Sequence, residues 1–274
     1  MLKDVTLGQY LPGDTLIHRI DPRMKLILTI VFIVTVFLAG NLWALLSVMF
    51  ISILLIIVSK ISPKVIFRAL RPVLFVMIFT VVISIFWKTG EGEPLFELWK
   101  IRIYKEGLVY ALLIALRIIV LVLGTNVLLS YTTSPIALTD GLEQLLSPLK
   151  RIKVPVHTFS MIMTIALRFI PTLIEETDKI MSAQRSRGAD FSTGSLAKRA
   201  KALVPVFIPL FASLIRRADE LAVAMECRCY TGDNGRTSMN TLKYKAIDFL
   251  ALAFTVAFAV GVFFISRYAG GYAF

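Results

Sequence analysis

The feature that most constrains this chain is a run of 34 residues without a formal charge, between Lys25 and Lys60. A single helix of that length would measure roughly 51 Å at ~1.5 Å per residue, whereas the hydrocarbon core of a bilayer is ~30 Å thick. The run must therefore fold back on itself, and Gly40-Asn41 is the only turn signal inside it. We predict two short membrane crossings, at about 26–39 and 44–59.

Three more apolar segments have charged residues at their boundaries. They cover 72–87, 108–130 and 249–266, and the second carries Arg117 near its middle. The whole chain is 57% hydrophobic and 18% charged, with a mean hydropathy of +0.78, which excludes an ordinary soluble domain. We therefore expect an all-α membrane protein with about five transmembrane helices.

The distribution of basic residues predicts the orientation. We attribute the net charge of +12 first to basic residues in cytoplasmic loops, as the positive-inside rule predicts, and not to a surface that binds nucleic acid. Segment 60–71 has four basic residues and no acidic one, whereas the four basic residues of 88–107 are balanced by four glutamates. With alternating spans, the N-terminus is expected in the cytoplasm and the C-terminus outside. The basic residues of the first segment are Lys60, Lys64, Arg68 and Arg71.

Residues 131–246 are too polar for a membrane domain and too long for a simple loop, with sixteen Lys/Arg and ten Asp/Glu. Two uncharged runs inside this region, Val154–Leu167 and Ala202–Ile215, are too short to span and too apolar for water. Long helices in the cytosol or at the membrane interface fit this pattern best. We therefore divide the chain into a membrane domain at 1–130, this helical region, and a last span with the C-terminal tail at 247–274.

An internal repeat lies within the helical region. Thr177–Phe191 aligns with Ala218–Gly232 at an offset of 41 residues, which places Arg187 on Arg228. A Phe-Ile-Pro element precedes each copy, although its distance to the arginine differs by three residues. The repeat therefore predicts one arginine at the C-terminal end of each of two paired helices. Such a position is favoured by the helix dipole alone, but a matched pair of exposed guanidinium groups also suits insertion into carboxylate-lined grooves.

Both copies show a narrow apolar stripe with steps of three and four residues, the spacing of helices that pack on one another. We assign the packing contacts between the two helices to these stripes. The first consists of Ile170, Leu173, Thr177, Ile180 and Gln184, and the second of Ile208, Phe211, Ile215, Ala218, Ala222 and Met225.

The motifs of catalysis and of metal binding are missing from the sequence. None of the fifteen glycines is followed by Lys, which excludes a P-loop, so any nucleotide hydrolysis must belong to another chain. Two histidines and two cysteines one residue apart make a poor metal site. The paired carboxylates Glu175-Glu176 and Asp219-Glu220 are expected to form salt bridges with Lys179 and Arg216-Arg217 rather than to act as general acids or bases. We expect no catalytic residue, no metal ligand and no cofactor bound by this chain.

Four stretches carry a family resemblance, and together they cover most of the chain. They are GQYLPGDTLIHRIDPRMKL (8–26), TTSPIALTDGLEQLLSPLKRIKVP (132–155), LRFIPTLIEETDKIMSAQRSRG (167–188) and KRAKALVPVFIPLFASLIRRADELAVAMECRCYTG (198–232). With these stretches the chain resembles the transmembrane T component of energy-coupling factor (ECF) transporters, and in particular the type shared among vitamin uptake systems.

The resemblance implies a non-catalytic subunit of an ATP-driven importer of a vitamin or metal in the cell membrane of a prokaryote. Two ABC-type ATPases would bind ATP and Mg, and a small membrane-embedded S component would bind the substrate. The family's long coupling helices end in Ala-Arg-Gly-like motifs that dock on the ATPases. Here those motifs are Ser186-Arg187-Gly188 and Cys227-Arg228-Cys229. The second keeps the arginine but lacks the glycine, which leaves the helix cap at that tip open.

Arg117 and Asp248 remain as charges within or beside the expected spans, and an intramembrane charge is by default a functional hypothesis. We expect Arg117 to pair with Asp248 or with an acid on a coupling helix. The alternative function is an autonomous channel or secondary transporter that binds an anion through Arg117. A membrane enzyme is a second alternative, against which the missing nucleophile and metal motifs count.

Overall fold

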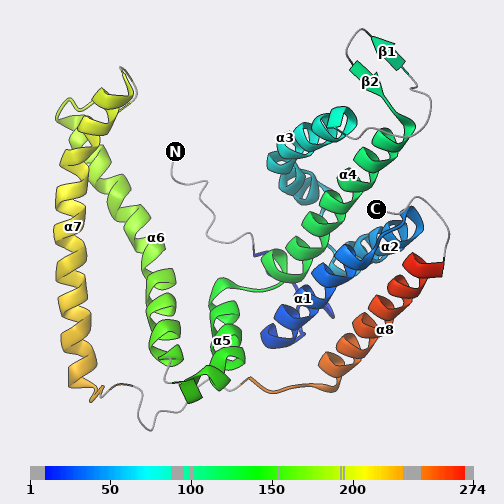
Figure 1. Cartoon of the computed structure of the whole chain (residues 1–274). Coiled ribbons are helices and arrows are strands. Elements are labelled where there is room, and N and C mark those ends of the chain that lie inside the picture. The colour runs from blue at the N-terminus through cyan, green and yellow to red at the C-terminus, as the bar shows by residue number, and fades with distance from the viewer. Residues whose placement is uncertain are drawn as a thin grey trace. The chain divides into compact units, whose positions relative to one another are not determined.

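The computed structural model describes residues 10–87, 96–98, 101–152, 155–191, 193, 195–230, 232 and 242–268 of the 274. Helices dominate the fold (Figure 1), which confirms the all-α membrane class. The acidic loop segment 89–94, on which the orientation partly depends, lies outside the described residues. In chain order the elements are α1 (Pro22–Leu38), α2 (Leu42–Ser59), α3 (Pro63–Trp87), strands β1 (Phe96–Leu98) and β2 (Ile101–Ile103), α4 (Lys105–Thr125), the π-helix η2 (Asn126–Tyr131), α5 (Pro135–Leu146), the 3₁₀-helix η3 (Ser147–Ile152), α6 (Val156–Ser186), α7 (Leu196–Cys227) and α8 (Ala246–Tyr268).

Two compact units make up the chain. One holds the described residues of 10–142 and 242–268, so that α8 packs against α1 and α2 although it is last in the sequence. The other holds the described residues between 143 and 232, where α6 and α7 form an antiparallel hairpin (Figure 1). A short antiparallel ladder of β1 and β2 follows α3 in the first unit.

The long uncharged run folds back where the sequence predicts. α1 begins with Asp21 as N-cap, whose side chain accepts a hydrogen bond from the Arg23 backbone N–H, and with Pro22 at its first position. It ends at Leu38, and α2 begins three residues after Ala39 at Leu42. The turn is tied to the end of α8, because Ser266 accepts from the Gly40 N–H at 3.0 Å and from the Asn41 side chain at 2.9 Å.

Five of the described helices are long and apolar enough to cross a membrane; four of them overlap segments that we expected, and α6 replaces the first. They are α2, α3, α4 continued by η2, α6 and α8, whereas α1 has only 17 residues. Of these five helices α6 is the least apolar. The third helix also begins nine residues earlier than 72–87, because Arg71-Pro72 lies inside α3 and does not interrupt it.

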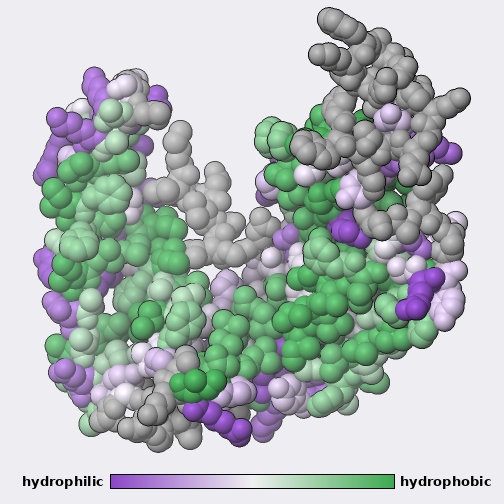
Figure 2. Space-filling model, in the orientation of Figure 1, coloured by the Kyte–Doolittle hydropathy of each residue, from purple (hydrophilic) through white to green (hydrophobic). Residues whose placement is uncertain are grey.

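The core of the first unit lies between α1, α2, α4 and α8. Gly124 permits the closest approach there, since a Cβ at this position would lie 2.2 Å from the ring of Phe32. Figure 2 shows apolar side chains over much of the visible surface of this unit as well, as expected for helices that face lipid. The buried members of the main cluster are Phe32, Val36, Ala39, Ala44, Leu45, Val48, Leu113, Val120, Leu128 and Val262.

A buried polar joint, which the sequence did not reveal, holds together the beginnings of α1 and α8. Asp248 is fully buried, and its carboxylate accepts from the backbone N–H of Asp21 at 2.9 Å and of Lys245 at 2.7 Å. Lys25 is 1% exposed and interacts electrostatically with Asp248. Its ammonium group donates a hydrogen bond to the carbonyl of Thr132 at 2.7 Å. The joint therefore links α1, α8 and the end of η2.

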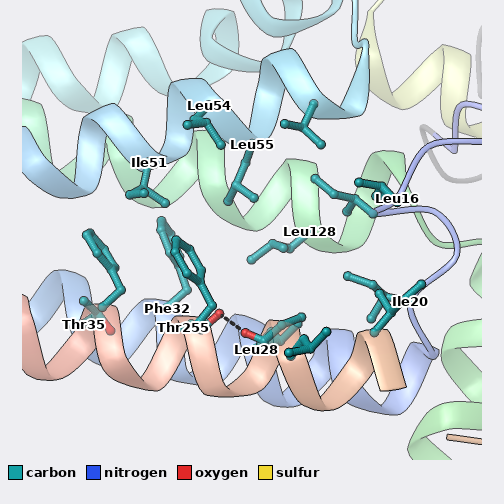
Figure 3. A pocket seen from close by; sticks show the side chains of 17 residues that line it. Leu16, Ile20, Leu28, Phe32, Thr35, Ile51, Leu54, Leu55, Leu128 and Thr255 are labelled. Carbon is teal, nitrogen blue, oxygen red and sulfur yellow. Dashed lines mark hydrogen bonds between the residues drawn. The ribbon is translucent and has the colours of Figure 1, made fainter. Parts of the chain in front are cut away.

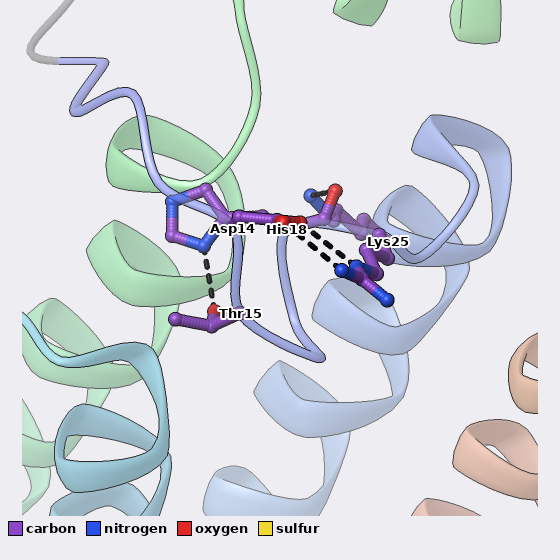
Figure 4. Close-up of polar contacts among 5 residues, drawn as sticks. Asp14, Thr15, His18 and Lys25 are labelled. Carbon is purple, nitrogen blue, oxygen red and sulfur yellow. Dashed lines mark hydrogen bonds and ion pairs between the residues drawn. The ribbon is translucent and has the colours of Figure 1, made fainter.

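The N-terminal arm, the described residues 10–21 that precede α1, adds a second set of contacts to the same region (Figure 4). His18 bonds to Thr15 at 2.7 Å and to the Leu11 carbonyl at 3.1 Å. Arg19 donates to both carboxylate oxygens of Asp14 at 2.8 and 2.9 Å, and this contact lowers the pKa of Asp14. Both histidines lie apart from any cluster of three or more possible metal ligands within the described residues.

An apolar groove of about 280 Å³ lies between the arm, α1, α2, η2 and α8 (Figure 3). Thr35 and Thr255 bring the only hydroxyl groups among its lining residues, and each donates to a carbonyl of its own helix. Both hydroxyl hydrogens are thus engaged within their own helices, and the other lining side chains are apolar. Its lining includes Leu16, Ile20, Leu28, Phe32, Ile51 and Phe254.

Arg117 and Asp248 do not pair, contrary to our expectation. Arg117 donates to the carbonyl of Ala39 at 2.7 Å, whereas Asp248 accepts from the N–H of Asp21. These two backbone groups lie at opposite ends of α1, roughly 27 Å apart at ~1.5 Å per residue. Because α1 is short, its C-terminal carbonyl would be without a partner in lipid, and the guanidinium supplies one.

Replacing Arg117 by Leu is expected to destabilise the membrane unit, because it removes the donor to the Ala39 carbonyl. A buried carbonyl without a partner costs about 1–3 kcal/mol. Thermal unfolding of the purified chain in detergent measures the effect. Arg267→Leu is the control, since Arg267 is exposed at the end of α8. Equal losses in the two variants would argue against a specific role for Arg117.

Replacing Asp248 by Ala is expected to cost more, about 3–5 kcal/mol, because two buried amides lose their acceptor and Lys25 loses its nearby negative charge. Asp248→Asn should lie between Ala and the wild type, since the amide keeps one acceptor oxygen. The same thermal measurement applies, with the exposed Asp219→Ala on α7 as control. An Asp248→Ala protein that unfolds at the same temperature as the wild type would contradict the stabilising role of these contacts.

Candidate functional site

The candidate site is the hairpin of α6 and α7 with its two arginine-bearing tips. The helices lie side by side and antiparallel (Figure 1). Glu176 on α6 connects them, because it accepts from the hydroxyl of Ser213 and forms an ion pair with Arg217 at 3.0 Å, both on α7. The salt bridges that we expected within each helix, with Lys179 and with Asp219-Glu220, are not formed among the described residues; Glu176 pairs across the hairpin instead.

The packing faces of the two helices agree only partly with the stripes in the sequence. The members of the first stripe, among them Ile170, Leu173 and Ile180, are half-buried. The second stripe needs correction: Phe211 is 65% and Ile215 49% exposed, and Ala218 and Ala222 are exposed as well. Of that stripe only Met225 is half-buried.

The side of α7 that faces α6 instead carries Val206, Ser213 and Arg217. Periodicity selected the other face because α7 is apolar all round between 202 and 215, so that hydrophobicity could not distinguish its sides. Polar contacts with Glu176 decide the orientation of the helix.

The first tip ends in a complete Schellman motif. Gly188 N–H donates to the Arg185 carbonyl at 2.9 Å, and Ala189 N–H donates to the Gln184 carbonyl at 3.0 Å. Gly188 has φ +87°, the left-handed conformation that this motif requires. Arg187 is the C-cap residue with φ −89° and ψ 6°, and it is exposed.

The second tip has the same geometry without a glycine. Cys229 N–H donates to the Glu226 carbonyl at 2.9 Å, and Tyr230 N–H donates to the Met225 carbonyl at 3.0 Å. Arg228 is the exposed C-cap residue with φ −94° and ψ 18°. Cys229 takes the left-handed position with φ 56°, which costs a residue with a side chain about 1–2 kcal/mol. The repeat in the sequence is therefore a structural repeat, and the cap that we left open is formed.

The two tips point to opposite ends of the hairpin. Gln184 near the end of α6 donates to the carbonyl of Pro205 at 3.4 Å, which places Arg187 level with the first turns of α7. Arg228 lies at the other end of α7, roughly 35–40 Å away at ~1.5 Å per residue. The flanking Ser186, Cys227 and Cys229 are exposed at their tips, and both cysteines are free thiols.

The comparisons with known proteins agree with this architecture. A multi-span helical membrane protein is the class that the fold defines, and the family model described as cobalt transport protein matches residues 13–239. Curated proteins called energy-coupling factor transporter transmembrane protein align over nearly the whole length. The one from Clostridium kluyveri is 49% identical and covers 92% of this chain and 93% of its own. Those from Ruminiclostridium cellulolyticum and Bacillus subtilis are 48% and 43% identical and cover 96% and 97% of this chain, and 97% and 99% of their own.

The chain therefore belongs to the family of energy-coupling factor transporter transmembrane proteins. This membership makes it the transmembrane component of a transporter with other subunits and a multi-pass protein of the plasma membrane.

The strained cap at the second tip leads to opposite predictions for neighbouring cysteines. Cys229→Gly should relieve the left-handed strain and slow hydrogen exchange at residues 229 and 230 by about fivefold, which corresponds to ~1 kcal/mol. Cys227→Gly should accelerate it, because Cys227 is helical and glycine weakens a helix by about the same amount. Hydrogen–deuterium exchange with mass spectrometry measures both. Equal effects of the same sign would refute the cap assignment.

Proposed function

We propose that this chain is the non-catalytic coupling subunit of an ATP-driven ECF importer for a micronutrient. The observation that carries the proposal is that one hairpin ends twice in the same exposed, arginine-bearing Schellman cap. In the proposed complex, Arg187 and Arg228 each dock in a groove of one of two ABC-type ATPases. The residues that flank them, Ser186 with Gly188 and Cys227 with Cys229, complete the two docking motifs.

The geometry of the hairpin supports two separate docking modules rather than one. Tips about 35–40 Å apart require two grooves at a comparable spacing. The hairpin is held internally by Glu176, so a displacement of either tip moves α6 and α7 together. ATP and Mg are bound by the ATPases, and their closing and opening would shift the tips relative to the membrane.

The exposed apolar side of the hairpin is the proposed binding surface for a small membrane-embedded S component. Figure 2 shows apolar side chains along the middle of the visible face of α6 and α7 and hydrophilic ones at both ends. Phe207, Ile208 and Phe211 are 62–66% exposed, so the stripe that does not pack within the hairpin is free for another protein. The substrate is chosen by the S component, in keeping with the largely apolar lining of the groove in this chain.

The proposed topology keeps the hairpin and the N-terminus on the cytoplasmic side and the C-terminus outside. The second half of α6 supports a place for the hairpin outside the hydrocarbon core, because Glu175, Glu176, Asp178 and Lys179 lie within five residues there. An autonomous channel that uses Arg117 has less support, since Arg117 is engaged with the Ala39 carbonyl.

Replacing both arginines by Ala is expected to weaken assembly with the ATPases and to abolish ATP-dependent uptake. Loss of a desolvated, charge-assisted contact costs about 2–5 kcal/mol at each site. Co-purification of the complex and uptake into vesicles measure the two effects, and each single variant should loosen one ATPase. Arg216→Ala, an exposed arginine in the middle of α7, is the matched control. Normal assembly and uptake in Arg187→Ala/Arg228→Ala would refute the docking assignment.

A further inference from the structure

Helix α3 has an inner and an outer face. Val65, Ile66 and Ala69 on the inner face pack against a cluster of Ile61, Val127 and Tyr131. The outer face carries the cations Lys64, Arg68 and Arg71, which lie within roughly 60° of one another at ~100° per residue. All three are exposed.

The same outer face becomes apolar further along the helix. Phe75 is 78% exposed, Ile78 59%, Phe79 58% and Val82 43%, and they continue the row of Lys64, Arg68 and Arg71 at steps of three and four residues. α3 contacts α4 along its other side (Figure 1). One continuous surface is thus cationic at its beginning and apolar over the following turns.

Among the described residues the three cations have no partner of opposite charge. The sequence has no Asp or Glu between Asp21 and Glu91. Arg71 is also only 16 residues from the end of α3 at Trp87, roughly 24 Å, which is less than the ~30 Å of a hydrocarbon core. Its guanidinium must therefore reach outward to a phosphate at the membrane surface.

We propose that the outer face of α3 is a binding site for an anionic phospholipid. The phosphate lies on Arg68 and Arg71 with Lys64 beside it, and Lys60 at the end of α2 adds a fourth exposed cation. An acyl chain runs along Phe75, Ile78 and Val82. A ligand that is negatively charged at one end and apolar over the next 15 Å or so matches this surface, whereas a soluble acidic protein would leave the apolar part uncovered.

The test titrates the full-length chain in neutral detergent with phosphatidylglycerol and with phosphatidylcholine, and follows bound lipid by native mass spectrometry. Wild type should prefer phosphatidylglycerol. Arg68→Gln/Arg71→Gln should lower that affinity roughly 25-fold, at about fivefold per cation, and leave phosphatidylcholine binding within about twofold. Lys64→Gln alone should lower it about fivefold, which gives a second measure if the double variant folds poorly. Arg68→Lys/Arg71→Lys should keep the preference.

The control Lys105→Gln/Arg267→Gln removes two exposed cations that begin α4 and end α8, outside this surface. It should bind phosphatidylglycerol like wild type. An unchanged preference in Arg68→Gln/Arg71→Gln, or an equal loss in the control, would overturn the proposal. So would displacement of the lipid by glycerol phosphate at the same concentration, because the apolar part of the site would then contribute nothing.

Discussion

The buried carboxylate of Asp248 is the contact on which the membrane unit depends most. It accepts the N–H groups of Asp21 and Lys245, and so ties the first residues of α1 to the first residues of α8. A carboxylate that is fully buried is stable only with strong hydrogen bonds and a nearby cation, and here two backbone amides and Lys25 supply them. Lys25 in turn holds the Thr132 carbonyl at the end of η2.

This joint also sets where α5 leaves the membrane unit. Gly141 on α5 lies so close to α1 that a Cβ would be 3.1–3.2 Å from Pro22 and the Arg23 backbone. The beginnings of α1 and α8 and the middle of α5 therefore form one tightly packed point. α5 then continues by chain connection into η3 and α6.

The need of helix ends for hydrogen-bond partners explains the position of Arg117 and the geometry of the two tips. Backbone groups at a helix end need partners, and a membrane or an exposed tip provides few. In the membrane unit Arg117 supplies a donor to the end of α1. At the tips the Schellman motif satisfies the last carbonyls internally, which leaves the side chains of Arg187 and Arg228 free for another protein. Arg117 thus forms a hydrogen bond inside the fold, whereas Arg187 and Arg228 are exposed at its surface.

The sequence alone determined the class, the fold-back of the long uncharged run and the position of both arginine tips, because each follows from local rules. Length against bilayer thickness, turn residues and helix-ending signals act over a few residues. It did not determine which face of α7 packs on α6, since the helix is apolar all round and the choice rests on Glu176 with Ser213 and Arg217. Nor could it show that Cys229 adopts the left-handed cap or that Asp248 bonds to Asp21 rather than to Arg117. The bond between Asp248 and Asp21 joins residues 227 positions apart, and only the packed structure brings them within hydrogen-bond distance.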